Sequence, residues 1–180
     1  MTTRPITMTL ARLRKLKPCH LERHEPLFEG KPSMTVRQAL EAGVSISDLL
    51  WVAGKLDLKS QIVSFAARVA REVAHLNPDP RVMAAIEAAE AWVREPSEGN
   101  TEAAADAAWA TTTTTPPRAA TWAALAAARA ATRAAWATAA ADAARGAAAD
   151  AAAAGADAGL SKQRIRKIFA KVFDPQEPST

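Results

Sequence analysis

Cys19, His20 and His24 are the residues of this 180-residue chain that come closest to a chemical site. Thiolates and imidazoles bind transition metals, and two histidines four residues apart share one face of a helix. The segment lacks the glutamate of a zinc-protease helix, and the chain has no second pair of cysteines. Pro26 interrupts the helix that this geometry needs. We therefore predict a polar N-terminal surface here and no metal site.

Other patterns that support catalysis are incomplete. Adjacent Cys19 and His20 do not face one another, and neither a third catalytic partner nor an oxyanion hole is identifiable. The Gly-Lys pair at 30–31 matches the end of a phosphate-binding loop. However, Glu25 stands where the first glycine of that loop belongs, and Pro32 replaces its Ser or Thr. The patterns GxGxxG and GxSxG do not occur. We predict a protein that is not an enzyme and binds no cofactor.

The composition predicts helices built from small residues. Apolar residues make up 49% of the chain, but Tyr is absent and Phe occurs four times, so large core side chains are scarce. The single cysteine excludes an internal disulfide and suits a reducing compartment. Basic residues interrupt every apolar run near the N-terminus, and nothing matches a membrane span. We predict a cytoplasmic protein that makes no membrane contact.

Capping residues and apolar spacings of three and four recur along the chain. Thr35, Ser47, Asp79 and Ser161 are predicted helix caps. Gly146 is predicted to divide the alanine-rich helix, because an unbroken rod of about 40 residues would reach roughly 60 Å. Strand patterns are absent. We predict an all-α fold, a compact bundle of short and medium helices. The predicted helices lie near 9–16, 21–28, 36–42, 48–55, 58–76, 80–94, 101–111, 116–154 with its break, and 162–173.

Alanine dominates the second half of the chain. It supplies 32 of the 56 residues from 103 to 158. We expect the helix of this alanine tract to end at Gly155 and Gly159. Alanine favours helix and allows helices to approach closely, but it brings little apolar area to bury. Three tryptophans stand out of the tract, and two of them flank an arginine at seven-residue intervals. They are either core anchors or the anchors of a protein partner. The candidate partner-binding residues are Trp109, Trp122, Arg129, Arg133 and Trp136.

The C-terminal helix predicts an alternative function. Residues 159–180 carry five basic and two acidic side chains, against 12 and seven in residues 1–76. Bound to DNA or RNA, such a helix would give a salt-dependent affinity without sequence preference. The simpler interpretation is an amphipathic helix with a solvated basic face. The candidate nucleic-acid contacts are Lys162, Arg164, Arg166, Lys167 and Lys171.

The segment NPDPRVMAAIEAAEAWVRE at 77–95, followed by AAADAAWA at 103–110, resembles the Imm5-like immunity-protein group of bacteria and phages. The match covers an Asp-Pro-Arg turn and the helix after it. The resemblance extends over residues 9–158 and includes the segment 35–51. The matching residues are Asp79, Pro80, Arg81, Ile86, Glu87, Ala88, Ala89, Ala91 and Trp92.

The resemblance implies a small helical protein that blocks another protein by binding it. The target would be a toxin in a bacterium, or a host defence effector such as a CRISPR nuclease complex in a phage. We therefore predict a non-enzymatic inhibitor that has a protein partner. Whether the chain also forms a homo-oligomer is left open. The alternative is a nucleic-acid-associated or structural phage protein. We expect three parts: a basic, partly irregular segment (1–34), a helical core (35–158), and a basic amphipathic helix with its tail (159–180).

Overall fold

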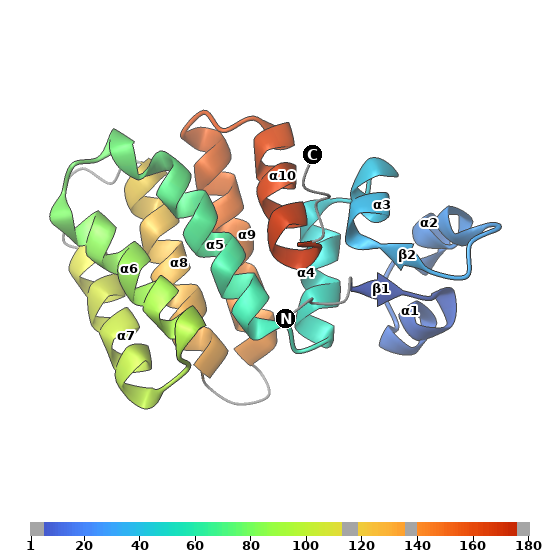
Figure 1. Ribbon diagram of the computed structural model, residues 1–180, viewed down its shortest axis with the longest axis horizontal. Helices are drawn as coiled ribbons and strands as arrows, with labels where there is room; N and C mark the ends of the chain where they lie inside the picture. The colour runs from blue at the N-terminus through green and yellow to red at the C-terminus, as the bar shows by residue number, and fades with distance from the viewer. Residues whose placement is uncertain (1–5, 113–118, 136–139, 176–180) are drawn as a thin grey trace.

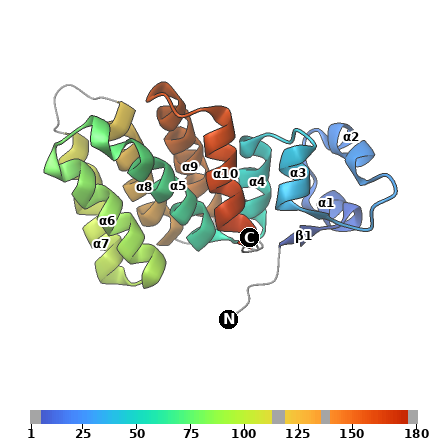
Figure 2. The same cartoon turned by 45° about the horizontal axis from the view of Figure 1, so that its top comes forward.

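The computed structural model describes residues 6–112, 119–135 and 140–175. Regular structure in these ranges is almost entirely α-helical, which confirms the predicted all-α class. The short N-terminal elements gather at one end of the molecule and the long helices form a bundle at the other (Figure 1). Figure 2 shows the same division from a second direction.

The N-terminal elements surround a small core of their own. Its buried members are Leu13, Phe28, Met34 and Ala39. Two short strands, which the sequence did not predict, pair antiparallel with Thr7 opposite Thr35 and Met8 opposite Met34. The predicted helix over 21–28 is divided at Pro26, where a 3-10 turn follows a single α-turn. The elements are β1 (Thr7–Met8), α1 (Leu10–Leu16), α2 (Leu21–His24), η1 (Glu25–Phe28), β2 (Met34–Thr35) and α3 (Val36–Glu41).

The bundle begins with α4 (Ile46–Lys55), which joins the two ends of the molecule. Helix α5 (Lys59–Val73) crosses both α8 (Ala119–Ala135) and α9 (Ala140–Asp157), as Figure 1 shows. Helices α6 (Pro80–Arg94) and α7 (Glu98–Thr112) pack against α8 from the other side. A 3-10 turn, η2 (Ala74–Leu76), continues α5, and α10 (Lys162–Phe173) closes the core against α5 and α9. Helix α8 is therefore the central helix of the bundle.

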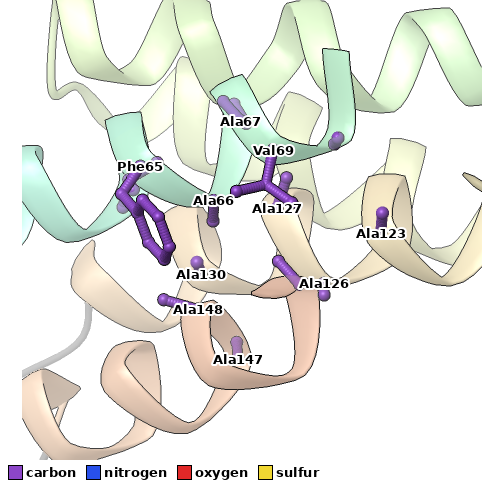
Figure 3. Close-up of a cluster of buried hydrophobic side chains, with 14 of the residues drawn as sticks. Phe65, Ala66, Ala67, Val69, Ala123, Ala126, Ala127, Ala130, Ala147 and Ala148 are labelled. Carbon is purple, nitrogen blue, oxygen red and sulfur yellow. The ribbon is translucent and has the colours of Figure 1, made fainter. Parts of the chain in front are cut away.

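Alanine makes this central position possible. Helix α8 packs against α5, α6, α7 and α9, and its buried side chains are alanines with the exceptions of Thr121 and Leu125. Figure 3 shows alanines of α8, among them Ala126, Ala127 and Ala130, next to Phe65, Ala66 and Val69 of α5 and to Ala147 and Ala148 of α9. Methyl-sized side chains let helix backbones approach closely and still fill the space between them. The larger side chains of α5 supply the bulk that the alanines lack.

Local capping chemistry sets most helix starts. Thr35 forms a capping box with Gln38: its hydroxyl accepts from the Gln38 N–H, and the Gln38 side chain accepts from the Thr35 N–H. Asp79 caps α6 with Pro80 at the first helical position, and Ser161 caps α10. All three caps are as predicted. They could be predicted from the sequence because each capping bond joins residues only two or three positions apart.

The prediction that Ser47 caps the helix α4 is wrong by two residues. Ser45 caps α4: its hydroxyl accepts from the Asp48 N–H at 3.0 Å and donates to Asp48 Oδ2 at 2.7 Å. Ser47 lies exposed inside the first turn. Asp48 stands three residues after Ser45, so both its N–H and its carboxylate can bond the Ser45 hydroxyl, whereas the residue three positions after Ser47 is the apolar Leu50.

Replacing Ser45 with alanine is expected to lower the free energy of unfolding by about 1 kcal/mol, because one N–H of the first turn loses its partner. Ser47→Ala is the matched control. It removes the same hydroxyl group two residues away and should change stability by less than about 0.5 kcal/mol. Urea unfolding of the two variants decides between the caps, and equal effects would contradict this assignment.

Two predictions about glycine are also wrong. Gly146 does not divide the alanine tract, and Gly155 does not end it, because α9 runs through both positions. The tract instead divides between Ala135 and Ala140, where residues 136–139 lie outside the described ranges. The predicted start of α8 at position 116 also lies outside them. Gly159, with φ of +95°, follows the end of α9 as predicted. The part of the tract after residue 118 thus forms two antiparallel helices, α8 and α9, rather than one rod (Figure 1).

Candidate protein-binding surface

Helix α8 exposes a narrow stripe between its packed faces. Trp122 is 50% exposed, and Arg129 and Arg133 are exposed further along the same side of the helix. Seven residues separate Trp122 from Arg129, so their directions differ by only about 20°. Almost every other described position of α8 is buried. The three exposed side chains therefore project from one line on an otherwise covered helix.

Helix α7 adds a second exposed tryptophan beside this stripe. The buried residues of α7 are Thr101, Ala104, Ala108 and Thr111, at the three- and four-residue spacing of one helix face. Trp109 falls one position outside that face, and 74% of its surface is exposed. A tryptophan this exposed is unusual, because burying its ring is normally strongly favourable.

A groove of about 410 Å³ between α7 and α8 brings the predicted residues together. Its walls include Trp109, Arg129 and Arg133, three of the five candidates. Trp122 is exposed nearby on α8 but does not line the groove, and Trp136 lies outside the described residues. We call the four described side chains the Trp–Arg face. The lining residues that the sequence did not single out are Ala105, Ala108, Thr112 and Thr132.

The groove combines a cationic wall with a small-residue floor. Both charged residues among its described lining are arginines, and no carboxylate lines it in the part of the chain that the structure describes. Alanine and threonine leave space that a partner side chain can fill. The spacing of Ala105, Ala108 and Thr112 on one side of α7 is the signal that could have indicated this floor.

The interpretation of the tract tryptophans as core anchors is wrong for Trp109 and Trp122. Helices that meet through alanine leave no room between them for an indole ring. Among the tryptophans that the structure describes, the buried one is Trp92 of α6. It is 3% exposed, and its indole N–H donates to the Thr101 hydroxyl at 3.2 Å. That hydrogen bond satisfies the polar end of a ring placed in the core.

Two of the five basic side chains of α10 form hydrogen bonds with other parts of the protein. Arg164 makes a forked ion pair with Glu72 of α5, with N–O distances of 2.7, 2.9 and 3.1 Å. Hydrogen bonding to Glu72 raises the pKa of Arg164 further above its ordinary value. Arg166 donates to the backbone carbonyl of Leu40. The exposed cations that remain for a nucleic acid are Lys162, Lys167 and Lys171.

The structure does not group Cys19, His20 and His24 as metal ligands. His20 occupies the N-cap position before α2, and its Nδ1 lies 3.5 Å from Oε1 of Glu22, while Cys19 is exposed. Within residues 6–112, 119–135 and 140–175, no three His, Cys, Asp or Glu side chains are grouped as metal ligands. The three residues instead line a pocket beside α4.

Comparisons with known proteins find no match: no family model, curated protein or solved structure is significantly similar to this chain. Among the described helices, none has both the length and the apolar character that crossing a membrane requires. The properties of the Trp–Arg face must therefore come from its own geometry.

Proposed function

We propose that this protein is a non-enzymatic inhibitor that binds a partner protein through the Trp–Arg face. The observation that carries this proposal is the exposure of Trp109, 74%, beside a groove walled by Arg129 and Arg133. Tryptophan and arginine are the residues that most often supply the binding energy of protein interfaces.

The energetic argument favours a protein over a small molecule. Covering the exposed part of Trp109 would contribute on the order of 3–4 kcal/mol before association costs. The two arginines add directional donors that can pair with carboxylates. Trp122 extends the same face along α8, so the anchors span more than one groove. A broad surface with separate anchors suits a folded partner.

The kind of partner follows from the resemblance to the Imm5-like group. Proteins of that type would act by occluding a toxin or a defence effector, including a CRISPR nuclease complex. We place the encounter in the cytoplasm, which suits a chain with a single exposed cysteine. The closely packed bundle behind the face supports this role, because a surface held in place by packing loses little entropy on binding.

Replacing Trp109 with alanine is expected to weaken binding of the partner at least about tenfold, because the central apolar anchor is lost. The experiment captures the partner from host lysate with a tagged chain, identifies it, and measures its Kd with the purified wild type and variant. The partner's activity is then assayed with increasing amounts of the wild-type chain. Inhibition that saturates at a defined stoichiometry is the expected result.

Matched variants distinguish the face from general surface effects. Trp109→Phe should retain part of the affinity, and Arg129→Ala should lose a comparable amount to Trp109→Ala. Arg68→Ala removes an exposed arginine of α5 outside the groove and should leave the Kd unchanged. A partner that binds all four variants equally, or whose activity does not respond to the chain, would overturn the proposal.

A further inference from the structure

An apolar pocket lies at the boundary between the N-terminal elements and the bundle, away from the Trp–Arg face. Its volume is about 260 Å³. The lining comes from β1 and η1 among the N-terminal elements, from α4, and from α9 and α10 of the bundle. The pocket therefore lies between the N-terminal elements and the bundle, next to α4. Its lining shares no residue with the groove between α7 and α8.

The pocket exists because the molecule has two apolar clusters rather than one. The N-terminal cluster and the bundle core are separate, and Leu49 of α4 packs at the edge of both. Inside the bundle, by contrast, Leu50, Ile62 and Phe65 are completely buried. An engineered cavity of about 150 Å³ holds benzene, so this larger space accommodates a longer apolar group.

The walls are adaptable and predominantly apolar. Met8 and Met34 contribute flexible thioethers, and Phe28, Trp51 and Phe169 contribute rings. Methionine and aromatic walls adjust to apolar ligands of varied shape. Such a lining favours a flexible hydrocarbon chain over a polar metabolite.

One strong cation lines this apolar space. Arg145 of α9 is half-buried and lines the same pocket as Phe169 and Phe173 of α10. Asp48, the carboxylate among the described lining residues, already accepts from Ser45 at the start of α4. Arg145 also interacts within the protein, but a guanidinium has five N–H donors and can hold a second acceptor. The lining therefore holds one guanidinium and one carboxylate, and Arg145 is the group that an anionic ligand can pair with.

We propose that this pocket binds a medium-chain fatty carboxylate. The acyl chain lies between α4 and the N-terminal cluster, and the carboxylate accepts hydrogen bonds from the Arg145 guanidinium. A planar guanidinium matches a carboxylate with two parallel bonds, and a low-dielectric wall strengthens the pair. This site is independent of the proposed inhibitor function.

Isothermal titration of the 180-residue chain with three ten-carbon probes tests the proposal. Decanoate is expected to bind, decan-1-ol to bind about tenfold more weakly, and decylamine to give no measurable binding. The alcohol retains the chain and loses the charge, whereas the amine reverses the charge. Absence of decanoate binding, or equal binding of decanoate and decan-1-ol, would overturn the proposal.

Two variants locate the site. Arg145→Gln should abolish the preference for decanoate over decan-1-ol while leaving decan-1-ol binding unchanged. Val52→Trp, at a half-buried lining position of α4, should fill the pocket and abolish binding of both probes. Arg129→Gln, which removes an arginine of the Trp–Arg face, should bind decanoate as the wild type does.

Thermal melting followed by circular dichroism establishes that each variant is folded. If Arg145→Gln does not fold, Val52→Trp and the three probes on the wild type decide the result. Unchanged decanoate binding by folded Val52→Trp would place the ligand elsewhere and contradict the proposal. Because Trp109→Ala leaves this pocket intact, its effect on partner binding distinguishes failure of the inhibitor function from failure of this site.

Discussion

Phe169→Ala is expected to lower the free energy of unfolding by about 3–5 kcal/mol, the largest single effect that the structure indicates. Phe169 of α10 is 1% exposed. Its ring lies 5.1 Å from that of Phe65 in an edge-to-face arrangement and 4.3 Å from that of Phe173 in a stack. The substitution removes both ring contacts and leaves a cavity that the neighbouring helices cannot close.

The size of this effect follows from how little bulk the rest of the core contains. Alanine fills the interfaces of α8 and α9, so the rings of α5 and α10 supply much of the large apolar area. Without Phe169, α10 keeps the Arg164–Glu72 ion pair, but exposed ion pairs contribute little to stability.

Guanidinium unfolding followed by circular dichroism measures the change. Lys167→Ala, on the exposed face of the same helix, is the matched control and should change stability by less than about 0.5 kcal/mol. A loss below about 1 kcal/mol for Phe169→Ala would mean that α10 does not anchor the core.

Elements whose boundaries depend on local chemistry were predictable from the sequence. Helix α10 begins and ends where the sequence predicts, because Ser161 caps it and its apolar residues recur at helical spacing. The same holds for α6, whose Asp79-Pro80 start needs no distant partner. Such signals involve residues a few positions apart, so a linear pattern contains them.

Features that depend on distant partners were not predictable in this way. The β1–β2 pair joins segments more than twenty residues apart through two residues each, which is too short for an alternating pattern. Gly146 reads as a helix breaker, yet α9 continues through it because tertiary packing outweighs a propensity cost of about 1 kcal/mol.

The exposure of the tryptophans at the candidate surface also depends on distant partners, so the sequence did not predict it. Trp92 and Trp109 both stand in alanine-rich helices, and the sequence does not say which one is buried. Trp92 is buried, and α7 brings Thr101 to its indole N–H, whereas Trp109 lies one position outside the buried face of α7 and stays exposed. Arg145 likewise gave no sequence signal, because its apolar surroundings come from segments far apart in the chain.

Gly155→Val is expected to lower the free energy of unfolding by about 3 kcal/mol. A Cβ added at Gly155 of α9 would lie 2.6 Å from Cγ1 of Val69 and 3.2 Å from Cδ1 of Leu160. Val69 is completely buried in α5 and β-branched, so it cannot rotate away without meeting its own neighbours. Helices α5 and α9 must therefore separate, and that separation disturbs the alanine contacts beside them.

The same substitution at Gly146 is the matched control within one helix. Nothing lies within 4 Å of a Cβ built there, so Gly146→Val should change stability by less than about 0.5 kcal/mol. The double variant Val69→Ala with Gly155→Val should be more stable than the sum of the two single losses predicts, because shortening Val69 removes the clash. Urea unfolding of the four variants measures this coupling. Equal effects at the two glycines would show that close approach of α5 and α9 is not what requires glycine, and additive losses would place the strain elsewhere than at Val69.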